Sequence, residues 1–176
     1  VGECAISSED AYATPLGDAQ IARDLADALS AQTEVSRVRG DEEHSIEMQL
    51  PMLQRALGTF RFVPILMSAD TLDACQRVGQ AIANVAQGRN LLLIASTDLS
   101  HLDDYAEVQR RDAEALQAIQ TFDVPSMARA LLQRDVTVCG RIPLLTVSVA
   151  AQMLGATRIQ FLHHTSSGDV TGRKEP

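Results

Sequence analysis

The chain has 176 residues, of which 45% are hydrophobic and 22% charged, and its formal net charge at pH 7 is −8. This size and balance indicate one globular domain. The acidic charge argues against nucleic acid or an anionic membrane as the main partner, and no apolar run approaches the roughly 20 residues of a membrane span. The three cysteines lack CxxC spacing and are typical of reduced thiols, so we expect a cytoplasmic protein.

Hydrophobic spacing predicts strands that alternate with helices along the whole chain. In order these are strand 3–7, helix 18–32, strand 35–38, helix 44–57, strand 60–67, helix 72–86, strand 90–95, helix 104–119, helix 124–132, an extended piece at 135–138, helix 139–154, strand 158–162 and a polar, turn-rich tail. Pro51 should kink or restart its helix, and Pro64 indicates an irregular or edge strand. The alternation predicts an α/β fold of three layers, with a central, mostly parallel sheet flanked by helices.

The stretch at 90–101 carries the clearest chemical signal, because an apolar run is followed by the sequence STDLSH. We expect the run to be a strand buried on both faces, and sites form beyond the carboxyl ends of such strands. Asp98 could orient a base or bind a cation, and His101 could act as a general acid or base near neutral pH. Two alternatives are that the polar residues cap the next helix, or that Ser96 or Ser100 serves a Ser-His-Asp hydrolase, although no GxSxG motif is present.

A second cluster lies at 42–47, where His44 and Glu47 are three residues apart and share one face of a predicted helix. Such a pair can hold a metal ion or a substrate. The alternative is a capping arrangement with solvated acids. The local sequence HSIE is not the HExxH motif of zinc peptidases, so that class of enzyme is not indicated.

The third cluster begins with Cys139 at a predicted strand-to-helix junction, where the positive end of the helix dipole favours the thiolate. Gly140 allows a close backbone approach, and Arg141 could clamp an anion. A thiolate here can be a soft metal ligand or a nucleophile. The alternative is a buried structural cysteine, which is also what we expect of Cys4 and Cys75.

Two adjacent histidines, His163 and His164, end the last predicted strand. Successive strand residues point to opposite faces, so at most one of the two imidazoles can face a given site. A pair of surface side chains is the default expectation.

Four motifs, in this order, resemble those of the Memo family: DEEHSIEMQLP at 41–51, STDLSH at 96–101, CGRIP at 139–143 and TSSGDVTG at 165–172. That family is similar in fold to the class III extradiol dioxygenases, which are non-haem iron enzymes that open catecholic rings. The resemblance implies a metal pocket at the strand ends, with Cys139 as a metal ligand and Asp98 and His101 lining it. His101 would match the general base of the dioxygenases, and His44 and Glu47 would approach from the neighbouring helix.

The chain departs from the family pattern in two places. The family's other metal ligands are two histidines in motifs resembling APHAGY and GPSHH, and neither motif occurs here; the closing strand after the last motif is also absent. We therefore expect residues 1–176 to form a single, partial Memo-like domain in which Cys139 without those imidazoles binds iron or copper weakly. An open strand face in such a domain is an association hazard. Either another chain supplies the missing segments, or self-association into a homo-oligomer covers the gap, or the fragment is functionally incomplete.

Three hypotheses of function follow from these clusters. The first is a metal-dependent redox or dioxygenase-like protein whose site consists of Asp98, His101, Cys139, His44 and Arg141. The second is a non-enzymatic binding or scaffold protein that uses the same pocket for a peptide or a small anion. The third is a cysteine or serine hydrolase, which needs a histidine within hydrogen-bond reach of Cys139 or Ser100 and an oxyanion site.

Overall fold

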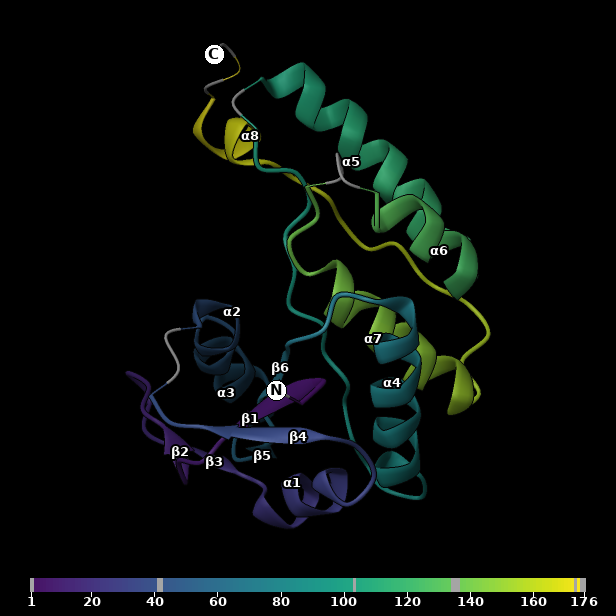
Figure 1. The fold of residues 1–176 in the computed structure, drawn as a ribbon. Coiled ribbons are helices and arrows are strands. Elements are labelled where there is room, and N and C mark those ends of the chain that lie inside the picture. Colours follow the sequence, from purple (N-terminus) through teal and green to yellow (C-terminus); the bar gives the residue numbers. More distant parts are fainter. Residues whose placement is uncertain (1, 41–42, 103, 134–136, 173, 175–176) are drawn as a thin grey trace.

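The computed structural model describes residues 2–40, 43–102, 104–133, 137–172 and 174. Its strands are short: β1 (Cys4–Ser7), β2 (Ala11–Tyr12), β3 (Ala19–Ile21), β4 (Val35–Val38), β5 (Arg61–Phe62) and β6 (Ile65–Met67). Its helices are α1 (Arg23–Ser30), α2 (His44–Glu47), α3 (Leu50–Leu57), α4 (Leu72–Ala86), α5 (Tyr105–Gln120), α6 (Val124–Leu131), α7 (Arg141–Met153) and α8 (Ser167–Thr171). The strands lie with α1 to α3 on one side of the molecule, and α4 to α7 form a helical part beside them (Figure 1).

The strands form two small sheets of mixed direction. One has the order β4-β1-β6, with β1 and β4 parallel and β1 and β6 antiparallel. The other has the order β2-β3-β5, with β2 and β3 antiparallel and β3 and β5 parallel. The α/β class is confirmed, whereas the described residues do not show the expected central, mostly parallel sheet.

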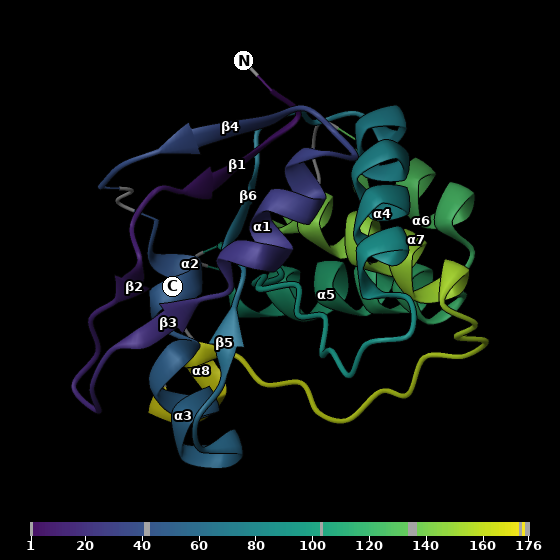
Figure 2. The same cartoon turned by 90° about the horizontal axis from the view of Figure 1, so that it is seen from below.

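Helices α4 and α7 pack closely along their lengths, and this contact is the centre of the larger core (Figures 1 and 2). Gly79 of α4 permits the close approach, because a Cβ at this position would lie 2.8 Å from the Cβ of Val149. Fully buried residues of α4, α6 and α7 fill this core, including Cys75, Met127 and Leu145. A smaller core lies between β1, α1 and α4. None of the described helices is long and apolar enough to cross a membrane.

Local capping signals in the sequence mark several helix starts correctly. Asp104 and Asp123 accept hydrogen bonds from the backbone N–H groups three residues later, and so begin α5 and α6 as N-caps. Pro51 lies in the first turn of α3, so the predicted helix at 44–57 restarts there as α2 and α3. The predicted strand at 60–67 is likewise divided at Pro64 into β5 and β6.

The strand predicted at 90–95 is wrong, because the structure gives these residues no strand conformation and no strand neighbour among the described residues. They are not buried on both faces, since Leu92 is 67% exposed. A strand needs an adjacent chain to pair its N–H and C=O groups. β6 pairs only with β1 and ends its sheet, so no described strand lies along its other edge.

The strand predicted at 158–162 is wrong for the same reason. These residues belong to a long extended connection from α7 to α8, which crosses the molecule without pairing (Figure 2). Leu162 in this connection is 83% exposed. Residues 167–171 of the tail, which was expected to be turn-rich, form the short helix α8, where Ser166 and Asp169 make a reciprocal capping box.

The predicted elements at 18–32 and at 135–138 have different outcomes. The helix predicted at 18–32 begins only at Arg23, because residues 19–21 pair with β2 and β5 as strand β3. Helical propensity is a weak prior, and this pairing overrides it. The extended piece predicted at 135–138 lies largely outside the described residues.

Candidate functional site

The polar segment after the apolar run, residues 96–101, is held in place from two sides. Thr97 accepts a hydrogen bond from the backbone N–H of Gly140, at 2.8 Å. Ser96 donates its hydroxyl to the carbonyl of Ser45 at 2.8 Å and accepts from Gln49 at 3.1 Å, which ties the segment to α2 and its C-terminal flank. The Ser96 hydroxyl is therefore directed toward α2, which disfavours its use as the nucleophile of a Ser-His-Asp hydrolase.

Three of the predicted site residues converge: one ligand atom each from Asp98, His101 and Cys139 lies within 4.8 Å of the other two. The backbone N–H of Asp98 donates to the Cys139 sulfur at 3.4 Å, across 41 residues of sequence. His101 Nε2 lies 3.5 Å from a carboxylate oxygen of Asp98. All three residues are exposed, so a ligand can reach them from solvent.

The chemistry of these donors suits a transition-metal ion. A thiolate, an imidazole and a carboxylate are the side chains that bind zinc, iron, cobalt and copper in proteins, and three donors leave coordination positions for water or substrate. The sulfur, nitrogen and oxygen atoms converge from two distant segments onto one small region. The residues present therefore fit a metal ion.

His44 and Glu47 do not belong to this cluster in the structure. His44 Nδ1 lies 2.8 Å from Glu47 Oε1, and the His44 side chain is 82% exposed. The hydrogen bond to Glu47, followed by the attraction of its charge, raises the pKa of the His44 imidazole. At the start of the same helix, Glu43 accepts the Ser45 N–H as N-cap, so the capping arrangement considered for this motif is present.

Arg141 is the first residue of α7, directly after the N-cap Gly140. Its side chain is partly buried, and its Nε atom has no hydrogen-bond partner among the described residues. Arg141 is not among the described residues that line the polar cavity next to Asp98 and His101. The structure thus places Arg141 next to Cys139 in sequence without showing an anion clamp.

A polar cavity of about 820 Å³ adjoins the cluster. Its lining combines Asp98 and His101 with residues from α5 and from the segment before α8. Beside it, Tyr105 donates its hydroxyl to Asp169 at 2.6 Å, and this bond is the main reason that the pKa of the Asp169 carboxyl is strongly lowered. Small polar molecules are the class of ligand that such a lining accommodates.

One pair in this cavity was not predicted from the sequence, namely the buried Asp112 and the partly buried His164. His164 Nε2 lies 2.7 Å from Asp112 Oδ2, and the two side chains are 20% and 5% exposed. The expectation of a surface pair of histidines is therefore wrong for His164, whereas His163 is exposed. A signal was present for Asp112, since it lies at helical spacing from Val108 and Ala115 on the buried face of α5.

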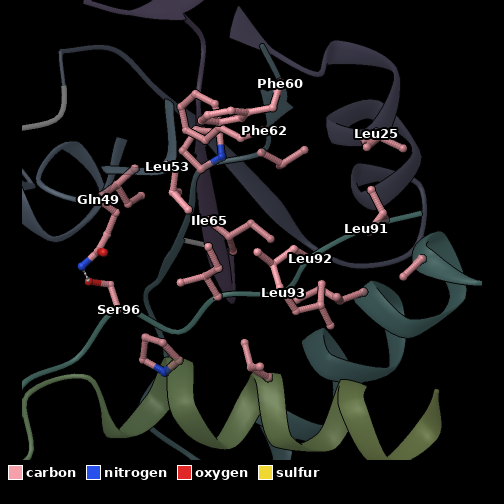
Figure 3. Close-up of a pocket in the computed structure, with 18 of the residues that line it drawn as sticks. Leu25, Gln49, Leu53, Phe60, Phe62, Ile65, Leu91, Leu92, Leu93 and Ser96 are labelled. Carbon is pink, nitrogen blue, oxygen red and sulfur yellow. Dashed lines mark hydrogen bonds between the residues drawn. The ribbon is translucent and has the colours of Figure 1, made fainter. Parts of the chain in front are cut away.

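The second large cavity is an apolar groove of about 700 Å³ on the other side of Ser96. Figure 3 shows Phe60, Phe62 and Ile65 facing the run of Leu91, Leu92 and Leu93 across it, with α7 along its floor. The apolar side chains of the run at 91–94, where no strand forms, line this open groove, and Leu92 remains 67% exposed. It carries few polar groups and lacks the convergent donors of the Asp98 cluster.

Proteins of one family match nearly the whole of this chain. The family described as "Memo-like protein" matches residues 2–176. A "MEMO1 family protein" of Methanopyrus kandleri is 36% identical over 174 residues, which is 96% of this chain and 62% of that protein. Proteins of the same description from Methanosarcina acetivorans and Nitrosopumilus maritimus are 35% and 32% identical, over 94% and 92% of this chain and 63% and 60% of theirs.

The chain thus spans a little under two thirds of the length of these relatives. The family match covers every described element, together with the three segments that supply the exposed cluster and the polar cavity. The chain belongs to the Memo-like protein family.

Proposed function

We propose that this Memo-like chain binds a transition-metal ion through Cys139, His101 and Asp98 and supports redox or dioxygenase-like chemistry in the adjoining polar cavity. The observation that carries the proposal is the convergence of the three ligand atoms within 4.8 Å of one another. Iron and copper are the metals that the family resemblance favours. When bound, such an ion would supply electron transfer or activation of oxygen.

Each of the three ligand residues has a distinct role in this proposed metal site. Cys139 provides the soft ligand, and its sulfur is held against the Asp98 backbone by the 3.4 Å contact with the Asp98 N–H. His101 can ligate the metal or exchange a proton with a bound molecule. Asp98 would provide the oxygen ligand, and one of its carboxylate oxygens lies 3.5 Å from His101 Nε2.

In this proposal His44, Glu47 and Arg141 contact the molecule that approaches the metal and do not bind the metal themselves. His44 and Glu47 lie on α2, which is fixed to the cluster's loop through Ser96. They would act on molecules that approach from the α2 side. The partly buried Arg141, with its unpartnered Nε, would meet an anionic group that enters near the start of α7.

The substrate class that this cavity favours is a small polar molecule. The cavity volume of about 820 Å³ admits a ring compound with hydroxyl groups, and the lining offers imidazole and carboxylate groups. The catecholic substrates of the dioxygenases with the similar fold belong to this class.

A second candidate is a binding or scaffold function in which the same cavity receives a peptide or a small anion. The high exposure of all three cluster residues favours it, because many catalytic metal sites are enclosed and exclude water. In this case the thiol of Cys139 would not need a metal, and its removal would leave ligand capture intact.

The decisive experiment is metal binding by the full chain. The purified protein would be titrated with Co²⁺, and the thiolate-to-cobalt absorption band would be recorded for the wild type, Cys139→Ser and the buried-cysteine control Cys75→Ser. We expect a 1:1 complex whose thiolate band is absent in Cys139→Ser and retained in Cys75→Ser. A protein that shows no thiolate band and no metal by elemental analysis would exclude the metal hypothesis and leave the binding function.

Activity is the second measurement. Oxygen uptake by the iron-loaded and copper-loaded protein would be followed with a panel of catechols. We expect His101→Gln to lower the rate by roughly 10²- to 10⁴-fold, the contribution typical of a general acid or base. A metal-loaded protein that consumes no oxygen with any catechol would restrict the function to metal binding.

A further inference from the structure

Asp112 is a carboxylate buried in the body of the protein, on the inner face of α5. Both of its oxygens have partners. Oδ1 accepts the backbone N–H of Ser100 at 2.9 Å, and Oδ2 lies 2.7 Å from His164 Nε2. An ionised carboxylate only accepts hydrogen bonds, so this contact fits the His164 tautomer that carries its proton on Nε2.

Because Asp112 is buried, its carboxyl group needs hydrogen-bond partners within the protein. An ionised carboxylate is expensive to remove from water unless it is paired and hydrogen-bonded. The pair satisfies both conditions, with a backbone donor on one oxygen and an imidazole on the other. The geometry of Ser100 and His164 around Asp112 is therefore constrained more tightly than that of a surface contact.

Ser100 lies between Asp98 and His101, the two members of the cluster that come from the same loop. The loop is anchored at Ser96, through Ser45 and Gln49, and at Thr97, where the N–H of Gly140 binds the hydroxyl. Asp112 supplies a further anchor at Ser100. The three-residue step from Thr97 to Ser100 is thus fixed at both ends, and Asp98 lies inside it.

His164 connects this arrangement to a different part of the chain. It comes from the extended connection between α7 and α8, which has no strand or helix of its own to hold it. Asp112 therefore joins three segments, namely α5, the cluster's loop and this connection, at the wall of the polar cavity.

We propose that Asp112 is the positioning residue of the metal cluster: it holds the Asp98–His101 loop through Ser100, and His164 holds the Asp112 carboxyl in place from the other side. This inference rests on the proposed metal-binding function. Loss of a carboxylate that orients the ligands of a metal site lowers the metal affinity by roughly 10- to 100-fold.

The test uses Co²⁺ titration of the full chain together with hydrogen exchange of the Ser100 amide in the metal-free protein. The variants are Asp112→Asn, which keeps the shape but removes the charge, and His164→Leu, which removes the donor. His164→Gln retains an N–H donor and is the conservative variant. Glu114→Gln is the matched control, because it removes one charge from an exposed position on the same helix.

We expect Asp112→Asn and His164→Leu to weaken Co²⁺ binding by roughly 10- to 100-fold and to shift the thiolate band. Exchange of the Ser100 amide should accelerate in both. His164→Gln should recover part of the affinity and the amide protection, and Glu114→Gln should behave as the wild type. If Asp112→Asn does not fold, the comparison of His164→Leu with His164→Gln gives the same information.

Wild-type affinity and wild-type Ser100 protection in a folded Asp112→Asn or His164→Leu protein would overturn the inference. Failure of the wild-type protein to bind Co²⁺ would instead overturn the metal-binding function. In that case the Ser100 exchange rates still decide whether Asp112 holds the loop, so the two failures are distinguishable.

Discussion

Gly140 donates its backbone N–H to the Thr97 hydroxyl at 2.8 Å and lies so close to it that a Cβ on Gly140 would stand 2.3 Å from the Thr97 Cβ. The same Cβ would lie 2.6 Å from the carbonyl oxygen of Ser96. Only glycine fits this contact, which confirms the close backbone approach predicted for Gly140. Through it, Cys139 is brought to the backbone of Asp98.

The first prediction concerns Gly140→Ala. The added methyl group must displace the loop at 96–98 and so separate Cys139 from Asp98. We expect a loss of stability of about 1–3 kcal/mol, as is typical of overpacking, and a loss of Co²⁺ affinity of at least roughly tenfold. Thr97→Ser, which keeps the hydroxyl, is the control and should retain both properties. A Gly140→Ala protein with unchanged melting temperature and metal affinity would contradict the close contact.

The second prediction concerns thiol reactivity. Cys139 is exposed, whereas Cys4 and Cys75 are buried, which confirms the structural role expected of the latter two. Burial raises the pKa of the Cys4 thiol to about 11 and also raises that of Cys75, so both remain protonated at neutral pH. We expect iodoacetamide to alkylate Cys139 at least roughly tenfold faster than either, measured by peptide mass spectrometry. Faster labelling of Cys75 would show that the α4–α7 core opens.

The third prediction is the pH behaviour of His44. Its pKa is raised chiefly by the hydrogen bond to Glu47, so the protonated pair favours the folded state at low pH. This contribution is complete below the unfolded-state pKa of histidine and is lost as the pH rises through the folded-state pKa. We expect the NMR titration midpoint of His44 to fall in Glu47→Gln and to stay unchanged in Glu9→Gln, a control that removes the same charge from another exposed position. An unchanged midpoint in Glu47→Gln would exclude the pair in solution.

Helix positions were predictable because their determinants are local. The N-cap residues Thr71, Asp104 and Asp123 each bind a backbone N–H within the next three residues, so a short window of sequence contains the whole interaction. Pro51 and Pro64 act on their own backbone in the same local way. These elements have the bounds expected to within a few residues.

The sheet was not predictable from such windows, because strand pairing depends on segments far apart in the chain. The run at 91–94 has the composition of a buried strand, yet its backbone has no described strand neighbour. Conversely, residues 19–21 belong to a helical pattern but pair with β2 and β5. Apolar periodicity reports burial of side chains and does not report whether a neighbouring backbone is present.

The candidate site shows the same division. Asp98, His101 and Cys139 were found because each lies in a short motif with reactive side chains, and the structure brings them together. Asp112 and His164 are 52 residues apart. The sequence around either residue does not identify the other as its partner. A carboxylate on the apolar face of α5 was the available sign that such a partner exists.

The last prediction compares two leucines that have opposite environments. Leu145 is fully buried in α7, whereas Leu162, for which the sequence predicted a strand, is 83% exposed. Truncation of Leu145 to alanine leaves a cavity in the α4–α7 core and should lower the free energy of unfolding by about 2–5 kcal/mol. Leu162→Ala should change it by less than about 0.5 kcal/mol, because an exposed side chain loses little on truncation. Chemical denaturation of both variants measures the difference, and a cost at Leu162 equal to that at Leu145 would show that the connection between α7 and α8 is packed against other residues in solution.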